Sequence, residues 1–319
     1  MPVYQGVWSL STQYQNASGW PLPPDGTRGV FAGGEGSNVI DFVTIASLGN
    51  ATDFGDLTET KNNAAGGVSS STRGVFALSS AASDNTLNYI TIATAGNALD
   101  FGDLSVGRRF AVGNSNATRG VFAMGQSASS NPDDVIDYIT IASTGNATDF
   151  GNLTVARKQG GSGINSGTRG VFISGIYGST FSNIIDYITI ASTGNATDFG
   201  DSTSGVVSNF GASSSTRGLN AGGMNSSYSN INVIEYITIA STGNATDFGD
   251  FTAIRAQCAG TSNPSRAVFG GGQYGGSVSL SNVIEFVTIA STGNATDFGD
   301  RTVSAKFLGA CSNGHGGLQ

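Results

Sequence analysis

One segment dominates the sequence: NVIDYITIASTGNATDFGDLT, or a close variant of it, occurs six times. Successive copies are 47 to 50 residues apart, measured between the central glycines Gly49, Gly96, Gly145, Gly194, Gly243 and Gly293. A second element, Thr-Arg-Gly-Val-Phe or a variant, precedes each copy. A single repeat of this length does not bury its own apolar faces and stacks on its neighbours instead. We therefore expect residues 27–319 to form one repeat domain.

Each repeat contains four segments typical of short β-strands. In the third repeat they are TRGVFAMG, DVIDYITIAST, ATDFGNLT and ARKQGGSGIN, of which the second is rich in Val, Ile, Tyr and Thr. Its apolar residues lie on both faces of an extended strand, which predicts a sheet covered on both sides. A helix is disfavoured by the β-branched content and by the Gly-Asn that follows. We expect Thr144–Asn146 to form the hairpin turn, because Gly and Asn accept positive φ.

Four-stranded units that are covered on both faces and repeated radially are the blades of a β-propeller. The order of elements resembles the kelch repeat: an apolar strand ending in paired glycines, as at Gly33 and Gly34, and then two strands that each carry an aromatic residue. The aromatic pairs are Phe42/Phe54, Tyr89/Phe101, Tyr138/Phe150, Tyr187/Phe199, Tyr236/Phe248 and Phe286/Phe298. Their separation of 12 residues is wider than in kelch repeats, and the second aromatic is never Trp. The resemblance implies an all-β, six-bladed, kelch-like β-propeller with four strands per blade.

The ends of the repeat region predict how such a ring closes. The innermost strand of small residues is missing before Thr27, whereas one extra copy remains at Ser304–Asn313. We expect this C-terminal strand to pair with the strands of Thr27–Thr58 and to complete the first blade. Closure of this kind removes the exposed edge that an open array would leave.

Residues 1–26 do not match the repeat and are treated as a separate N-terminal arm. They contain both tryptophans and four of the six prolines of the protein. One interpretation is an ordered arm packed on the propeller. The other is an attachment segment for a larger assembly, in which Trp8, Tyr14 and Trp20 would be the anchoring side chains.

The repeated charged residues favour structural interpretations. The arginines of the second element predict a six-membered ring: Arg28, Arg73, Arg119, Arg169, Arg217 and Arg266. Such a ring could bind an anion or a sugar, but we favour a structural pair with a repeated Asp of the same or the next blade. The Asp-Phe-Gly-Asp motif has carboxylates at a spacing seen in calcium sites but lacks a full ligand loop. We expect its aspartates to cap turn amides, and we predict no metal and no cofactor.

Several classes of function are disfavoured. The net charge is −8, and 16 of the 22 acidic residues occupy three repeated positions, so there is no basic surface for nucleic acid. No segment is apolar and long enough for membrane insertion. Cys258 and Cys311 are predicted to be buried thiols. The one histidine, His315, has no catalytic partners, so we predict that the protein is not an enzyme.

The copies differ most in the loops that follow the Val-Phe strand. These loops are residues 35–38, 79–86, 125–134, 175–183, 224–232 and 272–282. We expect them to gather on one face of the ring, where Tyr177, Phe181, Tyr228 and Tyr274 are the predicted ligand-binding residues.

The leader GVWSLSTQYQNASGWP, the near-identical repeats and the terminal SNGHGGL resemble structural proteins of tailed bacteriophages, in tail-fibre, baseplate or other appendage positions. The resemblance implies a non-enzymatic virion protein, assembled in the host cytoplasm. It would bind other virion proteins through residues 1–26 and a host-surface glycan or protein through its loops. Two alternatives stay open: an architectural decoration protein, and a glycan-cleaving enzyme with paired carboxylates among Asp84, Asp133 and Asp134. A homo-oligomer also stays open.

Overall fold

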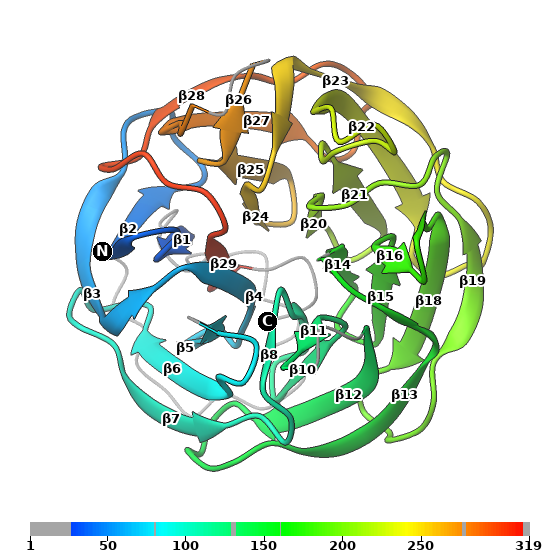
Figure 1. Ribbon diagram of the computed structural model, residues 1–319. Helices are drawn as coiled ribbons and strands as arrows, with labels where there is room; N and C mark the ends of the chain where they lie inside the picture. Colours follow the sequence, from blue (N-terminus) through cyan, green and yellow to red (C-terminus); the bar gives the residue numbers. More distant parts are fainter. Residues whose placement is uncertain (1–26, 80, 129–131, 160, 276–278, 315–319) are drawn as a thin grey trace, which may run out of the picture.

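The computed structural model describes residues 27–79, 81–128, 132–159, 161–275 and 279–314. They form six small antiparallel sheets arranged as the blades of a closed ring (Figure 1). The expected all-β, six-bladed propeller is therefore confirmed. The described residues contain no α-helix, so none of them provides a helix that could cross a membrane.

Every blade has the same strand order from the centre of the ring to its rim. The inner strands of blades 1 to 6 are β29 (Gly309–Ser312), β4 (Asn63–Ser69), β9 (Val112–Ser115), β14 (Ser162–Asn165), β20 (Phe210–Ser213) and β24 (Ala259–Ser262). The second strands are β1 (Arg28–Ala32), β5 (Arg73–Ser79), β10 (Arg119–Ala123), β15 (Arg169–Ile173), β21 (Arg217–Ala221) and β25 (Arg266–Gly270).

The two remaining strands of each blade come from the long repeat segment. The third strands are β2 (Ser37–Thr44), β6 (Thr86–Thr91), β12 (Asp133–Thr140), β18 (Ile184–Thr189), β22 (Ile231–Thr238) and β27 (Val283–Thr288). The outer strands are β3 (Thr52–Lys61), β7 (Leu99–Asp103), β13 (Thr148–Arg157), β19 (Thr197–Asp201), β23 (Thr246–Ala256) and β28 (Thr296–Asp300). Short extra strands lie in the connections: β8 (Arg108–Arg109), β11 (Gln126–Ser127), β16 (Ile176–Tyr177), β17 (Thr180–Phe181) and β26 (Gln273–Tyr274).

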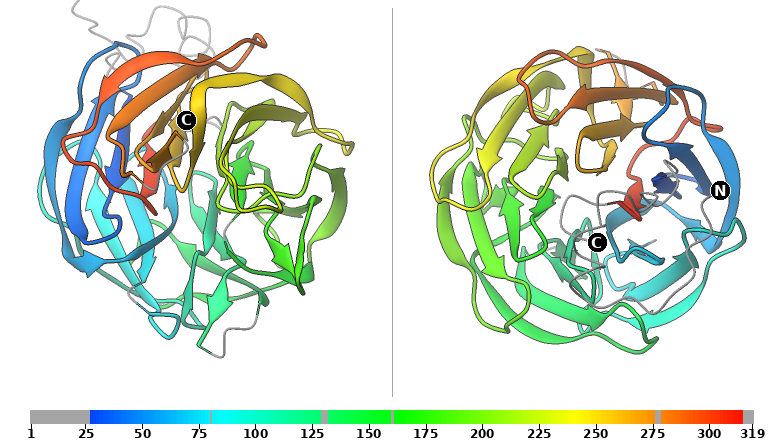
Figure 2. Two further views of the ribbon diagram at one scale, coloured as in Figure 1. Left: turned by 45° about the horizontal axis from the view of Figure 1, so that its top comes forward. Right: turned by 180° about the vertical axis from the view of Figure 1, so that it is seen from behind.

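The ring closes through the C-terminal strand, as expected. Strand β29 pairs antiparallel with β1, so that Cys311 lies opposite Val30. Figure 1 accordingly shows β29 (red) beside β1 (blue) near the centre of the ring. The right-hand view of Figure 2 shows the same two strands from behind. The paired strand is shorter than the predicted Ser304–Asn313, because it begins only at Gly309.

The core fills the spaces between neighbouring blades. In blade 1, Val30 packs with Phe76 and Ile90 of blade 2, whereas Phe31, the next residue, packs with Val268 of blade 6. Alternate residues of a strand point to opposite faces, so both faces of each sheet are buried. This arrangement explains why the Val-Phe pair and the long third strand are apolar on both sides.

The connection between the third and outer strands differs from the prediction. The turn lies at residues 141–143 in blade 3, where Ser143 N donates to Thr140 O at 3.2 Å. Gly145 and Asn146 follow this turn and do not form it. The predicted hairpin turn at Thr144–Asn146 is therefore wrong, because this Gly-Asn pair binds the neighbouring blade instead.

The antiparallel order gives the ring two different faces. The connections from third to outer strands and from inner to second strands lie at one end, which we call the Asn face. The connections from second to third strands and from each outer strand to the next inner strand lie at the other end, the loop face. All the loops that vary between repeats thus share the loop face.

Candidate functional site

The six repeated arginines lie on the Asn face and join adjacent blades. The Arg119 guanidinium stacks 4.4 Å from the centre of the Tyr138 ring, and its Nη1 donates to Ile190 O of the next blade at 3.0 Å. The other five, Arg28, Arg73, Arg169, Arg217 and Arg266, make the same pair of contacts at 4.2–4.4 Å and 2.8–3.0 Å.

The expected aspartate partner of these arginines is wrong. The register pairs Arg119 with Thr140 and Val121 with Tyr138, so the arginine and the tyrosine share one face of the sheet. Asp137 points to the opposite face because side chains alternate along a strand. The arginine therefore meets an aromatic ring and a backbone carbonyl, which gives a cation–π contact plus a hydrogen bond.

The Gly-Asn pair forms a second link on the Asn face. Asn146 Oδ1 accepts from the backbone amide of Asp103 in the preceding blade at 3.1 Å, and Gly145 N donates to Phe101 O at 2.7 Å. The same bond from the side-chain oxygen is made by Asn50, Asn97, Asn195, Asn244 and Asn294. The aspartates of Asp-Phe-Gly-Asp were expected to cap turn amides. In the structure, the Asn side chain instead accepts from the backbone amide of the motif's last residue, which is the second aspartate in five blades and Asn152 in blade 3.

A third link lies in the body of each blade interface. The polar residue of every third strand accepts a hydrogen bond from a hydroxyl of the preceding blade, supplied by Thr58, Ser105, Thr154, Thr203, Thr252 or Thr302. At four interfaces a buried arginine also pairs with an acid at this position. The four pairs are Arg108–Asp137, Arg157–Asp186, Arg255–Glu285 and Arg301–Asp41.

These buried arginines were not predicted from the sequence. Three of them stand seven residues after the Phe of Asp-Phe-Gly, and this spacing is the signal that could have found them. Burial raises the pKa of Asp186 above its ordinary value although Arg157 opposes the shift, and burial lowers the pKa of Arg157. Both groups are fully enclosed, so we interpret the pair as structural.

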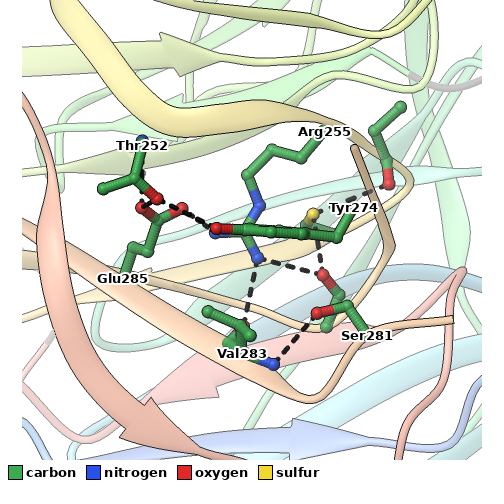
Figure 3. A network of polar contacts seen from close by, with 9 residues as sticks. Thr252, Arg255, Tyr274, Ser281, Val283 and Glu285 are labelled. Atoms are coloured by element: carbon green, nitrogen blue, oxygen red, sulfur yellow. Dashed lines mark hydrogen bonds and ion pairs between the residues drawn. The ribbon is translucent and has the colours of Figure 1, made fainter. Parts of the chain in front are cut away.

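Tyr274, one of the predicted binding residues, belongs to such an interface (Figure 3). Its hydroxyl lies 3.1 Å from Thr252 Oγ1, which also binds the Glu285 carboxylate, and its ring lies 5.6 Å from the Arg255 guanidinium. Arg255 Nη2 donates to the carbonyls of Gly271 and Val283, each at 3.1 Å. Tyr274 therefore helps to hold blade 5 against blade 6.

The carboxylates considered for glycan cleavage serve local structure. Asp133 is buried; its Oδ1 accepts from Val135 N at 2.9 Å, and its Oδ2 lies 3.6 Å from Arg108 Nη1. Asp84 Oδ1 accepts from the amide and the hydroxyl of Thr86. Asp134 is half-buried and follows Asp133 in β12. Within the described ranges, no group of three or more His, Cys, Asp or Glu side chains is placed to hold a metal ion.

The other three predicted binding aromatics lie on the loop face, and two of them are in contact. Tyr177 and Phe181 belong to the β16–β17 hairpin of blade 4, and the Phe181 ring lies 5.0 Å from the Tyr228 ring of blade 5 at an interplanar angle of 80°. The exposed fractions of Tyr177 and Tyr228 are 53% and 60%. Phe181 and Tyr228 thus form an aromatic pair across two blades. Tyr177 lies on the opposite face of its hairpin, because its neighbour Ile176 is the residue paired with Phe181.

The inner strands surround a central cavity of about 160 Å³ that the sequence analysis did not identify. Its lining consists of glycines, small hydroxyl residues, carboxamides and a few apolar side chains, with no charged residue among them. At the loop-face end, five non-glycine residues at equivalent positions adopt left-handed backbone, with φ of 55–63°: Phe110, Gln159, Ser208, Gln257 and Phe307. Strained backbone of this kind often marks functional sites.

Cys258 and Cys311 are buried free thiols, as predicted. The predicted attachment residues Trp8, Tyr14 and Trp20 lie outside the described residues, as does His315. No protein-family model and no curated protein matches this sequence.

Proposed function

We propose that this protein is a non-enzymatic structural component of a tailed-bacteriophage virion. In this proposal residues 1–26 attach it to other virion proteins, and the loop face of the propeller binds a glycan or protein on the host surface. The virion role is supported by the sequence resemblance described above. The binding role is supported by the aromatic group of the loop face, which consists of the Phe181–Tyr228 pair and, on the other face of the same hairpin as Phe181, Tyr177.

The aromatic group is the single observation that carries the binding role. Large aromatic side chains that are exposed to solvent gain free energy when a partner covers them, and Tyr is among the residues that dominate binding interfaces. The pair Phe181–Tyr228 is formed by two different blades, so its geometry depends on the rigid interface between them. Variable loops on a rigid scaffold are a common way to build a binding surface.

Adsorption of the purified, labelled protein to host cells tests the proposal. We expect the wild type to bind and the double variant Tyr177→Ala/Tyr228→Ala to bind about tenfold or more weakly, because interface tyrosines often contribute about 1–2 kcal/mol or more. The control is Leu48→Ala/Leu99→Ala, which removes two exposed apolar side chains at the Asn face. Equal binding by both double variants would contradict the role of the aromatic group.

The same samples separate the alternatives. A protein that is incorporated into particles but does not adsorb to cells would support the architectural role. Release of oligosaccharide from host polysaccharide would support an enzyme. A variant lacking residues 1–26 should fold, with an unchanged circular dichroism spectrum, but should not be incorporated into particles; normal incorporation would contradict the attachment role of the arm.

A further inference from the structure

Tyr228 has an unusual backbone conformation for a large exposed residue. Its φ is 56°, in the left-handed region, and its exposed fraction is 60%. It is the third left-handed residue in the loop that follows the second strand of blade 5. In blades 1, 4 and 6 the third left-handed residue of the same loop is a glycine: Gly36, Gly178 and Gly275. The left-handed region is less favourable for tyrosine than for glycine, because a Cβ atom crowds the backbone. The conformation of Tyr228 must therefore be held by its surroundings.

Asn225 closes the short loop that carries Tyr228. The backbone N of Asn225 donates to Ser229 O at 3.0 Å, and its carbonyl accepts from Tyr228 N at 2.8 Å. Its side-chain Oδ1 accepts from Ser227 N at 3.0 Å and from Ser229 N at 3.1 Å. Asparagine side chains commonly stabilise turns by accepting from amides a few residues further along the chain. Asn225 therefore supplies the hydrogen bonds that offset the unfavourable backbone conformation of Tyr228.

Gly205 allows the hairpin that carries Phe181 to come close to the blade interface. A Cβ at Gly205 would lie 2.2 Å from Phe181 O and 2.7 Å from the Phe181 carbonyl carbon. These are backbone atoms, so a larger residue at this position would displace the β16–β17 hairpin. The Phe181 ring would move with it, although it now lies 5.0 Å from the Tyr228 ring. The contact between the two rings thus depends on the absence of a side chain at Gly205.

The two loops share one support, the connection between blades 4 and 5. Gly175 N, at the base of the hairpin, donates to Val206 O at 3.1 Å. Met224 N, at the base of the Tyr228 loop, donates to Val207 O at 2.8 Å, and Val207 N donates to Met224 O at 3.1 Å. Residues 205–207 are consecutive, so both loops are fixed to the same short stretch of backbone. The relative position of the two aromatic rings is therefore set within the free protein.

From these contacts we infer that Gly205 and Asn225 are positioning residues, which hold Phe181 and Tyr228 against each other before any partner binds. The importance of this pair for host binding rests on the proposed function, whereas the positioning itself does not. A side chain that is already fixed loses less conformational entropy when a partner covers it. Substitution of Gly205 or Asn225 should therefore weaken binding through its effect on the aromatic pair.

The contact between the two rings in the free, full-length protein tests the positioning directly. Nuclear Overhauser effects between selectively labelled Phe181 and Tyr228 rings should be present in the wild type and lost in Gly205→Ala and Asn225→Ala. Asn225→Asp keeps an acceptor oxygen for the two amides and should keep the ring contact. Ring contacts that persist in both alanine variants would overturn the inference. Persistence in one of them would show that this residue has no positioning role.

The chain offers a matched control for each substitution. Gly107 is at the position equivalent to Gly205 in the connection between blades 2 and 3, and a Cβ there would lie 2.3 Å from Ser83 O. Gly107→Ala should lower Tm about as much as Gly205→Ala. Asn116, on the Asn face, accepts from two backbone amides as Asn225 does. Gly107→Ala and Asn116→Ala should both adsorb to host cells as the wild type does.

Adsorption of the variants tests the consequence for binding. Gly205→Ala and Asn225→Ala should each bind about threefold to tenfold more weakly, the range expected when one side chain must be immobilised on binding. In a Tyr228→Ala background, Asn225→Ala should cause no further loss, because no ring is left to position. A further loss of the same size in that background would overturn the positioning role of Asn225.

Failure of the inference can be distinguished from failure of the proposed function. If the wild type does not adsorb but the ring contacts respond as expected, the host-binding role is contradicted and the positioning is supported. If Tyr177→Ala/Tyr228→Ala abolishes adsorption but the ring contacts are unchanged in Gly205→Ala and Asn225→Ala, the host-binding role is supported and the positioning is wrong.

Discussion

The Asn face and the loop face of the ring come from the same repeat but are constrained differently. On the Asn face, all six arginines and all six Gly-Asn asparagines make the same contact with the adjacent blade. On the loop face, the connections differ in length and sequence, and so do their contacts: β16 pairs with β17 of its own loop, whereas β26 pairs with β23 of the preceding blade. A residue that makes the same contact with the adjacent blade at every interface cannot be replaced without loss of that contact. A residue in a local loop can, and the loop face is therefore where new function can arise.

The buried ion pairs lie between the two faces. Substitutions that break one of these pairs should reduce the free energy of unfolding more than the other substitutions considered below. Arg157 comes from the end of an outer strand but reaches Asp186 of the next blade at 2.9 Å, and both side chains are completely buried. Arg157→Met would leave Asp186 without its countercharge, and we expect the free energy of unfolding to fall by about 3–5 kcal/mol. Urea denaturation measures this change.

Two controls sharpen this prediction. The double variant Arg157→Met/Asp186→Leu should recover most of the lost stability, because a buried pair replaced by apolar side chains is often neutral. Val206→Met changes the equivalent position of blade 4, where no arginine is present, and should cost about 1 kcal/mol. Equal losses in Arg157→Met and Val206→Met would show that the ion pair does not stabilise the interface.

The cost of replacing a glycine by alanine can be compared between the two faces. Both have positive φ, but a Cβ at Gly102 would lie 2.6 Å from the carbonyl carbon and oxygen of Gly145 in the next blade, whereas a Cβ at Gly178 in the blade 4 loop meets no atom within 4 Å. We expect Gly102→Ala to cost at least about 3 kcal/mol, since backbone strain of ~1–3 kcal/mol is added to the clash. Gly178→Ala should cost about 1 kcal/mol from strain alone. Thermal denaturation would contradict the comparison if the two variants had the same Tm.

The smallest effects are expected from single asparagines. Asn146→Ala removes the acceptor for the Asp103 amide of another blade, and Asn225→Ala removes the acceptor for the Ser227 and Ser229 amides of its own loop. The hydrogen bonds at both sites are exposed to solvent, so we expect losses of about 0.5–1 kcal/mol for Asn146 and no more than about 0.5 kcal/mol for Asn225. Hydrogen exchange should locate each effect. Faster exchange at Asp103 in the Asn225 variant would contradict a purely local role for that loop.

The parts of the propeller that depend on residues close together in the sequence could be predicted. The contacts between blades could not. The period of 47–50 residues, the β-branched strands and the extra strand at the C-terminus predicted six blades and their closure. The turn at Gly-Asn was predicted wrongly because the prediction used only the preference of Gly and Asn for turns and took no account of the neighbouring blade. In the structure the backbone amide of Gly145 binds across the blade interface instead.

The candidate site could be predicted only in part. The aromatic residues Tyr177, Phe181 and Tyr228 stood out because they interrupt the repeat, yet nothing in their spacing shows that Phe181 and Tyr228 meet while Tyr274 packs into an interface. In blade 5, Asn209 donates to Asn220, which donates to Glu235; in the sequence the two asparagines are only separate departures from the repeat. Their connection is visible only when the blades are assembled.

By itself, then, the sequence determined the fold, the number of blades and the faces of each strand that are buried, since these follow from strand propensity and from alternation along each strand. Tertiary structure alone decided the partners across the blade interfaces, such as the carbonyl that accepts from Arg119 and the acid that pairs with Arg157. The physical reason is that alternation fixes the side of the sheet to which a residue points. The residues that it contacts on that side belong to the next blade, about 50 residues away in the sequence, and the closure of the ring brings that blade against it.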